Sequence, residues 1–282
     1  MTPMKPNDVT IVAATRDERL LLYFDLLGFR EMVKTGQADL IHRVLALAMQ
    51  KATYEADKRS DKLKTVIDTI YFSDTILLYP KTAGFHSETF KQLRFAANAI
   101  CRALLSESIP VSGAMTFGSF VVGKVDGHRE PVYFGQALID AYDFEKQEKW
   151  LGILVCPSVA SRLDPAEIEA GAARGTWRVR GKAKGDTCLL LNPFQPILAL
   201  AEQKKRPAAI SALKSHDQRV FLALQFIHQT SQDHAQNGNF SSSAAVRYHA
   251  VAAFAKSVLG DERYNWAVSL PKFKTKGTTS SK

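Results

Sequence analysis

The sequence is poor in cysteine and contains no long apolar run. Its three cysteines, Cys101, Cys156 and Cys188, stand far apart, which argues against a disulfide framework or a zinc site and favours reduced, buried thiols. No stretch of about 18 apolar residues occurs, so no membrane span is expected. The N-terminal MTPMKPNDVT lacks the basic and apolar segments of a signal peptide. These absences predict a cytoplasmic protein.

Acidic residues are outnumbered by basic ones, 28 against 37, and the formal net charge is +9. A basic balance favours anionic partners such as nucleotides, nucleic acids or acidic membranes. No basic stripe is interleaved with aromatic residues, so nucleic acid is not expected as a partner. A solvated basic surface and tail is the simpler explanation, because much of the excess falls late in the chain.

Hydrophobic periodicity gives an order of elements that predicts the fold class. Hydrophobic residues make up 46% of the chain, enough for a sizeable core. Strands are expected over 19–25, 63–72, 75–80, 109–123 (or a hairpin there), 151–156, 176–180 and 187–191, and helices over 28–58, over 87–107 and after 135. The β-α-β-β-α-β order predicts a ferredoxin-like α+β core, an antiparallel sheet with helices on one face.

Three regions follow from this pattern. Residues 1–17 are interpreted as a poorly ordered lead-in and residues 18–192 as the α+β domain. Residues 193–282 are interpreted as a helical extension, largely helical over 195–260, that ends in a disordered tail.

An aspartate stands inside the apolar run LLLYFDLLGF at residues 20–29. A carboxylate removed from water costs several kcal/mol unless it meets a cation or hydrogen-bond donors. Asp74 lies at the tight turn between the strands 63–72 and 75–80, and this chain order brings the end of the first strand beside that turn. Two carboxylates placed together suit one or two hard divalent cations such as Mg²⁺ or Mn²⁺. We therefore predict a metal site at Asp25 and Asp74.

Gly28 follows at the turn from strand to helix. Backbone N–H groups at a helix start, with no side chain crowding them, can hold phosphates, so Leu27, Gly28 and Phe29 are predicted to cradle phosphate groups. Two simpler explanations stay open: Asp25 could cap the following helix, and Asp74 could be an ordinary turn residue.

These residues resemble the class III nucleotidyl cyclase homology domain over roughly 19–192. That family opens with an F-x-D-(I/L)-x-G-F pattern, to which the run from Phe24 to Phe29 is similar. Phe72-Ser73-Asp74 resembles the position of the family's second metal aspartate. Three more segments look like family segments in the same order: VSGAMTFG at 111–118, GQALIDAYDFE at 135–145 and RGKAKGD at 180–186.

The chain departs from the family at the positions that read the base and at an arginine that helps to stabilise charge in the transition state. The family's purine cyclases carry an asparagine and an arginine four and eight positions after the helix glycine, where this chain has Ile139 and Asp143. The purine-selecting lysine corresponds to Ile70 and its acidic partner to Val132. Neither side chain can read an adenine edge, so another base or an inactive site is implied. A shifted register is open as well, since LKTVID at 63–68 also resembles the lysine-bearing strand.

The segments FDLLGF and YFSDTILL most resemble the corresponding segments of the pyrimidine cyclases of bacterial anti-phage (Pycsar) systems. That resemblance implies conversion of UTP or CTP to the 3′,5′-cyclic monophosphate, a second messenger that switches on a separate effector protein. It also implies a homodimer with sites at the interface. UTP is the first choice and CTP the alternative, followed by a purine nucleotide and then by a degenerate cyclase-like regulatory or binding module.

The resemblance also implies roles for individual residues. The ribose 3′-hydroxyl attacks the α-phosphate and pyrophosphate leaves, with Asp25 and Asp74 bridging two Mn²⁺ or Mg²⁺ ions and the carbonyl of Leu26 as a further ligand. Nucleotide contacts are assigned to Phe24, Leu27, Gly28, Phe29, Ile70, Tyr71 and Lys182. Arg180 and Lys184 are rivals of Lys182, Arg129 is a candidate for the missing arginine, and Tyr133 and Phe134 are candidates for the base pocket.

Overall fold

The computed structural model describes residues 11–36, 39–40, 42–43, 46, 67–125, 131–148, 150–164, 176–180, 187–202, 206–207, 209–238 and 242–271. The strands are β1 (Ile11–Leu26), β2 (Ile67–Phe72), β3 (Thr75–Pro80), β4 (Val111–Val125), β5 (Val132–Phe134), β6 (Gly152–Val155), β7 (Thr176–Arg180) and β8 (Thr187–Leu191). The helices are α1 (Phe29–Lys34), α3 (Ser87–Ser106), α4 (Gln136–Glu148), α5 (Pro157–Ala160), α7 (Gln195–Ala201), α8 (Ser215–Gln236), α9 (Ser243–Leu259) and α10 (Asp261–Ser269), with a 3₁₀ turn at Ile210–Ala212.

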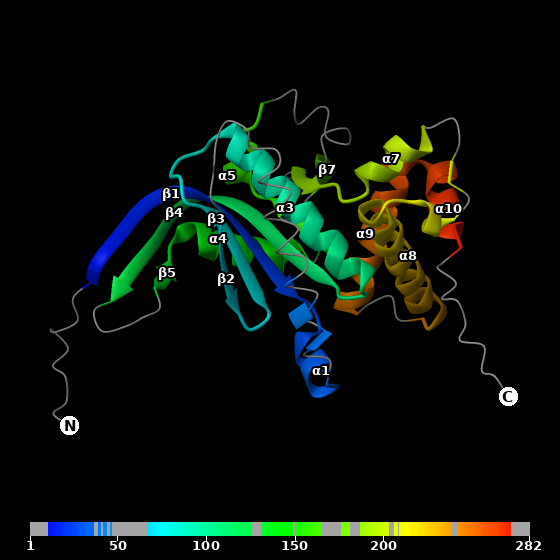
Figure 1. Ribbon diagram of the computed structural model, residues 1–282, viewed down its shortest axis with the longest axis horizontal. Coiled ribbons are helices and arrows are strands. Elements are labelled where there is room, and N and C mark those ends of the chain that lie inside the picture. The colour runs from blue at the N-terminus through cyan, green and yellow to red at the C-terminus, as the bar shows by residue number, and fades with distance from the viewer. Residues whose placement is uncertain are drawn as a thin grey trace.

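One eight-stranded sheet organises the chain (Figure 1). Its strand order is β2-β3-β1-β4-β6-β8-β7, and β5 pairs with β4 off this path. The pairings are antiparallel except for that of β4 with β6, which is parallel. The predicted ferredoxin-like α+β core and its helical extension are thus present. The long strand β1 lies in the middle of the sheet, between β3 and β4.

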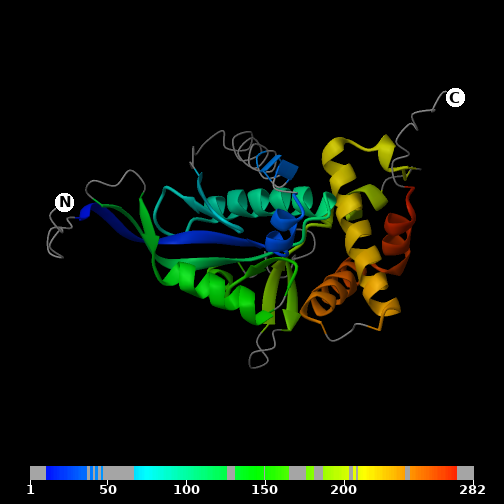
Figure 2. The same cartoon turned by 90° about the horizontal axis from the view of Figure 1, so that it is seen from below.

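The two faces of the sheet carry different helices, as Figure 2 shows, with α3 on one side and α4 on the other. The expectation that the helices lie on one face was therefore wrong. Because side chains alternate along a strand, β1 serves both layers. Phe24 packs toward α3, whereas Tyr23 meets Tyr142 of α4 with ring centroids 6.3 Å apart.

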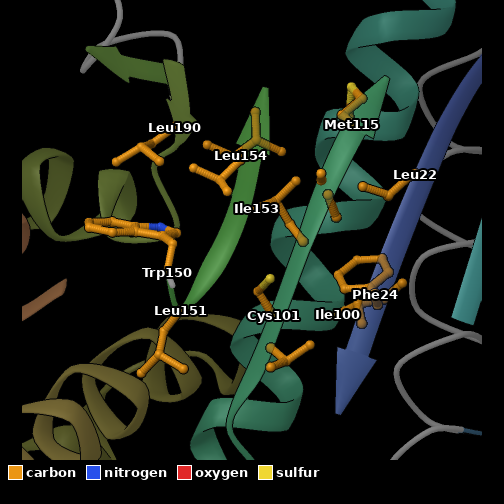
Figure 3. Close-up of a cluster of buried hydrophobic side chains, with 14 of the residues drawn as sticks. Leu22, Phe24, Ile100, Cys101, Met115, Trp150, Leu151, Ile153, Leu154 and Leu190 are labelled. Atoms are coloured by element: carbon orange, nitrogen blue, oxygen red, sulfur yellow. The ribbon is translucent and has the colours of Figure 1, made fainter. Parts of the chain in front are cut away.

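The layer between the sheet and α3 is the main apolar core. Figure 3 shows side chains from α3, β1, β4 and β6 meeting there, among them Leu22, Phe24, Ile100, Cys101, Met115 and Ile153. Leu22 and Phe24 have no exposed surface. Burial of this kind contributes about 1.5–3 kcal/mol for each large apolar side chain. The packing of these side chains holds β1 in place up to Asp25.

Most predicted elements are confirmed, with three differences. β1 begins at Ile11, well inside the expected lead-in, because it pairs with β4 along its whole length. The segment 109–123 forms a single strand, β4, and not a hairpin. Of the predicted helix over 28–58, the structure gives α1 and further helical residues at 39–40, 42–43 and 46, and residues 47–66 lie outside the described residues. The expected tail beyond residue 271 also lies outside them.

The C-terminal helices pack on the end of the sheet layer. α8 lies against α3, and α9 and α10 lie against α8 (Figure 1). Phe221, Leu224 and Ile227 of α8 are wholly buried in the same apolar cluster as the strands. The helical extension is therefore continuous with the core. Among the described residues, no helix is both long and apolar enough to cross a membrane.

Gly113 lies where the backbones of β4 and β1 approach each other closely. A Cβ built at this position would lie 2.1 Å from the carbonyl oxygen of Tyr23 and 2.8 Å from Cδ1 of Ile153. We expect Gly113→Ala to lower the free energy of unfolding by about 1–3 kcal/mol, because the strands must part to accept it. Urea denaturation measures the change. Gly118→Ala on the same strand is the control, since its Cβ would meet only ordinary contacts of 3.5 Å or more with Ala137. Equal effects of the two substitutions would contradict the close approach.

Candidate active site

Asp25 and Asp74 lie beside each other at one edge of the sheet. Asp25 is the penultimate residue of β1, and it pairs with Thr75 of β3 on one side and Ser112 of β4 on the other. Asp74 occupies the turn between β2 and β3, and its carbonyl accepts a hydrogen bond of 2.9 Å from the N–H of Leu26. Ser73 supports this turn with a left-handed φ of 58°. The two predicted metal-binding residues thus sit on adjoining backbone.

The side chain of Asp25 faces α4, not the main core. It is 8% exposed, and its Oδ2 accepts a hydrogen bond of 3.0 Å from Nζ of Lys146. Lys146 Nζ also lies 3.3 Å from Oε2 of Glu145. The ammonium group therefore stands between two carboxylates. The ammonium group of Lys146 supplies the positive charge that the buried carboxylate of Asp25 requires.

Glu145 is a second buried carboxylate, with no exposed surface at all. Its Oε1 accepts hydrogen bonds from the hydroxyl of Ser112 and from Nη1 of Arg247, the latter at 3.1 Å. Arg247 comes from α9 and is itself 8% exposed. The same Nη1 also donates to the carbonyl of Trp150 at 2.9 Å. A chain of charges thus runs from the helical extension through α4 to Asp25.

The local charges shift two pKa values. Burial raises the pKa of Asp25 above its ordinary value, repulsion from Glu145 and Asp74 adds to the rise, and the hydrogen bond and charge of Lys146 oppose it. For Lys146, burial alone would lower the pKa. The hydrogen bond with Asp25 and the charge of Glu145 outweigh burial and raise that pKa above the usual lysine value, so the ammonium stays protonated. The site therefore concentrates negative charge around a single ammonium group.

The turn between β1 and α1 fits the predicted phosphate cradle in part. Gly28 is the N-cap residue of α1 with a φ of 77°, a conformation that favours glycine, and no side chain caps the helix. Asp25 is therefore not a helix cap. The N–H of Leu27 donates to the carbonyl of Pro110 at 2.9 Å, so it is engaged within the protein. Gly28 and Phe29 remain the candidates for phosphate.

The predicted nucleotide-binding side chains do not all lie together. Phe24 has no exposed surface and packs in the core against Ile100, so its assignment as a nucleotide contact was wrong. The register of β2 with β3 places Ile70 on the same face as Asp25, whereas Tyr71 points to the opposite face. Tyr71 is 49% exposed there.

The structure describes some of the remaining candidate residues and leaves others outside the described ranges. Tyr133 stacks on Phe120, meets Tyr79 at a tilted angle and so belongs to an aromatic cluster, while Phe134 is 51% exposed. Ile139 and Asp143 are exposed on α4. Lys182, Lys184 and Arg129 lie outside the described residues, as does the side chain of Arg180, so their roles stay predictions.

Sequence reasoning missed Lys146, Arg247 and Ser112. Glu145 fell inside the segment that suggested a cyclase helix, but its burial was not foreseen. The sequence did give one signal for Lys146: an aspartate in an apolar run, Asp25, needs a cation or hydrogen-bond donors as partners. No spacing in the sequence identifies a partner 121 residues further on.

The donor set fits divalent cations. Asp25 and Asp74 stand on adjoining backbone. Burial is the main cause that raises the pKa of Asp25, and the charge of Asp74 adds to the rise, so a cation held by the two carboxylates would favour their ionised forms. Within the described part of the chain, no group of three or more His, Cys, Asp and Glu residues could hold a metal ion. A cation held by Asp25, Asp74 and a main-chain oxygen such as that of Leu26 would keep positions for water and phosphate, as Mg²⁺ usually does in proteins.

The buried pair of Arg247 and Glu145 should be important for stability. Arg247→Met leaves the Glu145 carboxylate without its arginine partner, and we expect the free energy of unfolding to fall by about 3–5 kcal/mol. Urea denaturation measures this loss. Lys256→Met on the same helix is the control, because Lys256 and Asp261 form an exposed pair, and such pairs contribute about 0–1 kcal/mol. A loss no larger than that of the control would refute the buried network.

Asp25 should cost stability when no metal is bound. A carboxyl group whose folded pKa is raised stabilises the fold below its unfolded pKa, and that contribution is lost as the pH rises through the folded pKa. We therefore expect Asp25→Asn to raise the melting temperature at pH 7 in EDTA, with a smaller gain as the pH falls toward 4. Melting curves across this range are the measurement. A variant less stable than wild type at pH 7 would contradict it.

No protein-family model matches the chain, and no curated protein matches it. Among solved structures, the guanylyl cyclase Cya2 aligns over 64% of this chain and 93% of its own, with 15% identity and a TM-score of 0.41. The adenylyl cyclase CyaB from P. aeruginosa aligns over 64% and 96%, with 13% identity and a TM-score of 0.40. The guanylate cyclase domain of RhGC from Catenaria anguillulae, in complex with GTP, aligns over 63% and 96%, with 13% identity and a TM-score of 0.40. Likeness at this level carries no conclusion about activity, so function must be argued from the chain's own residues.

Proposed function

We propose that this chain is a nucleotidyl cyclase that converts UTP to 3′,5′-cyclic UMP and pyrophosphate. The observation that carries the proposal is the meeting of Asp25 and Asp74 through the hydrogen bond between Leu26 and Asp74. A binding module has no need of two carboxylates placed together, whereas phosphoryl transfer uses such pairs to hold divalent cations. The cyclase-like sequence segments described above support the same function.

Each part of the site has a role in this proposal. Asp25 and Asp74 would hold Mn²⁺ or Mg²⁺, which supply charge neutralisation of the triphosphate and activation of the ribose hydroxyl. The amides of Gly28 and Phe29 would receive the β- and γ-phosphates, because no side chain caps this helix start. Rigid placement of Asp25 comes from β1, whose alternate side chains are locked in the core. The attacking hydroxyl and the leaving pyrophosphate would thus be held in one geometry.

The preference for a pyrimidine rests on Ile70. Its side chain lies on the face of the sheet that also presents Asp25, and it is apolar where a purine-reading lysine would be required. Val132, 38% exposed, is equally unable to accept or donate a hydrogen bond with its side chain. UTP is therefore the proposed substrate, CTP the alternative and a purine nucleotide the third choice. The product would serve as a second messenger in anti-phage defence, acting on a separate effector protein.

A homodimer belongs to this proposal. Phe72 is 79% exposed and lies in register with Thr75, and Ile139 and Tyr142 of α4 are 54% and 48% exposed. Exposed apolar side chains that gather around a site mark interaction surfaces. A second copy of the chain is the proposed partner, with the two sites at the interface.

A degenerate module that binds nucleotide without turnover is the second candidate. The observation in its favour is that Asp25 already has a cationic partner in Lys146, while an exposed aspartate, Asp143, stands where an arginine would be required. In that case the helical extension would contact a regulatory partner. The two candidates differ in whether any cyclic product forms.

Product analysis tests the function. The purified protein is incubated with Mn²⁺ and each of the four nucleoside triphosphates, and cyclic monophosphates are identified by mass spectrometry. We expect cyclic UMP from UTP. We expect Asp74→Asn to reduce its rate by at least about 100-fold, because a carboxylate that holds the cations becomes a neutral amide.

Three outcomes distinguish the candidates. Cyclic CMP alone would change the base but keep the mechanism, and cyclic AMP or cyclic GMP would refute the assignment of Ile70. No cyclic product from a folded dimer, with retained nucleotide binding, would favour the degenerate module. Lys34→Met is the control for nonspecific effects, since Lys34 and Glu31 form an exposed pair on α1.

A further inference from the structure

We infer that Lys146 is a catalytic residue of this site, an internal cation that pairs with Asp25 in the metal-free protein and with the triphosphate of the substrate in the loaded one. The inference rests on the proposed function, because it takes Asp25 and Asp74 as the metal ligands. It assigns the positive charge that Asp143 cannot supply. Lys146 follows one helical turn after Asp143 on α4.

The position of Lys146 meets the requirements of such a role. Its Nζ lies 3.0 Å from Oδ2 of Asp25, so it already stands where the cations would be held. The side chain is 44% exposed, which leaves the ammonium accessible from solvent. It also lies over the ring of Tyr142, with Nζ 5.4 Å from the ring centroid. Lysine is a flexible point charge with three donors, so Nζ can change partners by rotation of its own stem.

Charge balance explains why Lys146 must change partners. Asp25, Asp74 and Glu145 bring three carboxylates to this edge of the sheet. Arg247 is committed to Glu145 and to the carbonyl of Trp150, and Lys146 is the cation that meets Asp25 within the described ranges of the chain. When Asp25 binds a divalent cation, two positive charges cannot share its carboxylate without repulsion. The phosphate oxygens of a bound triphosphate then replace Asp25 as a partner of Nζ, which keeps Oε2 of Glu145 beside it.

Glu145 and Arg247 act as positioning residues for this movement. Glu145 is fully buried and held by Ser112 and Arg247, and its Oε2 lies 3.3 Å from Nζ of Lys146. This contact tethers the ammonium at the site after Asp25 has released it. Arg247 belongs to α9, so the helical extension supports the active centre from behind.

The test compares Lys146→Met with wild type in two binding measurements. Mn²⁺ affinity without nucleotide is measured from the electron paramagnetic resonance signal of free Mn²⁺. Affinity for inorganic triphosphate is measured by calorimetry at saturating Mn²⁺, which removes any dependence on the base. We expect the variant to bind Mn²⁺ about fivefold more tightly and triphosphate about fivefold more weakly, the range of a partly exposed ion pair.

A gain in Mn²⁺ affinity together with a loss in triphosphate affinity is what we expect when the cation removed is one that changes partners. Lys146→Arg should keep triphosphate affinity within about twofold of wild type, since the charge is retained. Lys91→Met on α3 is the matched control, because Lys91 is 42% exposed and pairs with Glu88. Changes of equal sign in the two affinities, or changes no larger than those of Lys91→Met, would overturn the inference and leave Lys146 a structural ion pair.

Failure of the proposed function is visible separately. Asp25→Asn and Asp74→Asn should each weaken Mn²⁺ binding. If neither does, the two-aspartate metal site is wrong and the role of Lys146 falls with it. If both do while Lys146→Met binds Mn²⁺ and triphosphate as wild type does, only the present inference is wrong.

Discussion

The ion pair between Asp25 and Lys146 is the interaction around which the site is arranged. Asp25 is nearly buried because β1 runs through the middle of the sheet, and a buried carboxylate needs a cation. Lys146 provides it, but Lys146 lies beside Glu145, which is buried more deeply still. Glu145 in turn requires Arg247 from α9. Each charge is tolerated only because the next one is in place.

This arrangement makes the helical extension part of the site. α8 packs on α3, and α9 sends Arg247 across to α4, so the extension braces both layers of the sheet. A strained or charged site costs stability, and here the apolar layer beneath α3 offsets that cost. The core fixes β1, and β1 presents Asp25. The apolar layer on one face of the sheet therefore supports a charged arrangement on the other.

Positions along a strand decide which of the assigned residues share a face of the sheet. Asp25 and Ile70 lie on the face of the sheet that α4 covers. Their sequence neighbours, Phe24 and Tyr71, lie on the opposite face. The pattern F-x-D suggested that Phe24 touches the nucleotide, but its neighbours in register send it into the core with Ile100. Similarly, Leu27 was expected to offer its amide to phosphate, and Pro110 takes it instead.

The sequence by itself determined the strand and helix order, the β2–β3 hairpin and the presence of a carboxylate in an apolar run. These features are local, since they follow from periodicity, from turn residues and from the cost of burying one charge. Only the tertiary structure decided that α4 covers the opposite face from α3, and that Lys146 and Arg247 complete the charges around Asp25 and Glu145. Those pairings join residues separated by 121 and 102 positions, and hydrophobic patterning carries no information on which distant cation will meet a given carboxylate. Their geometry arises when the sheet, α4 and α9 pack together.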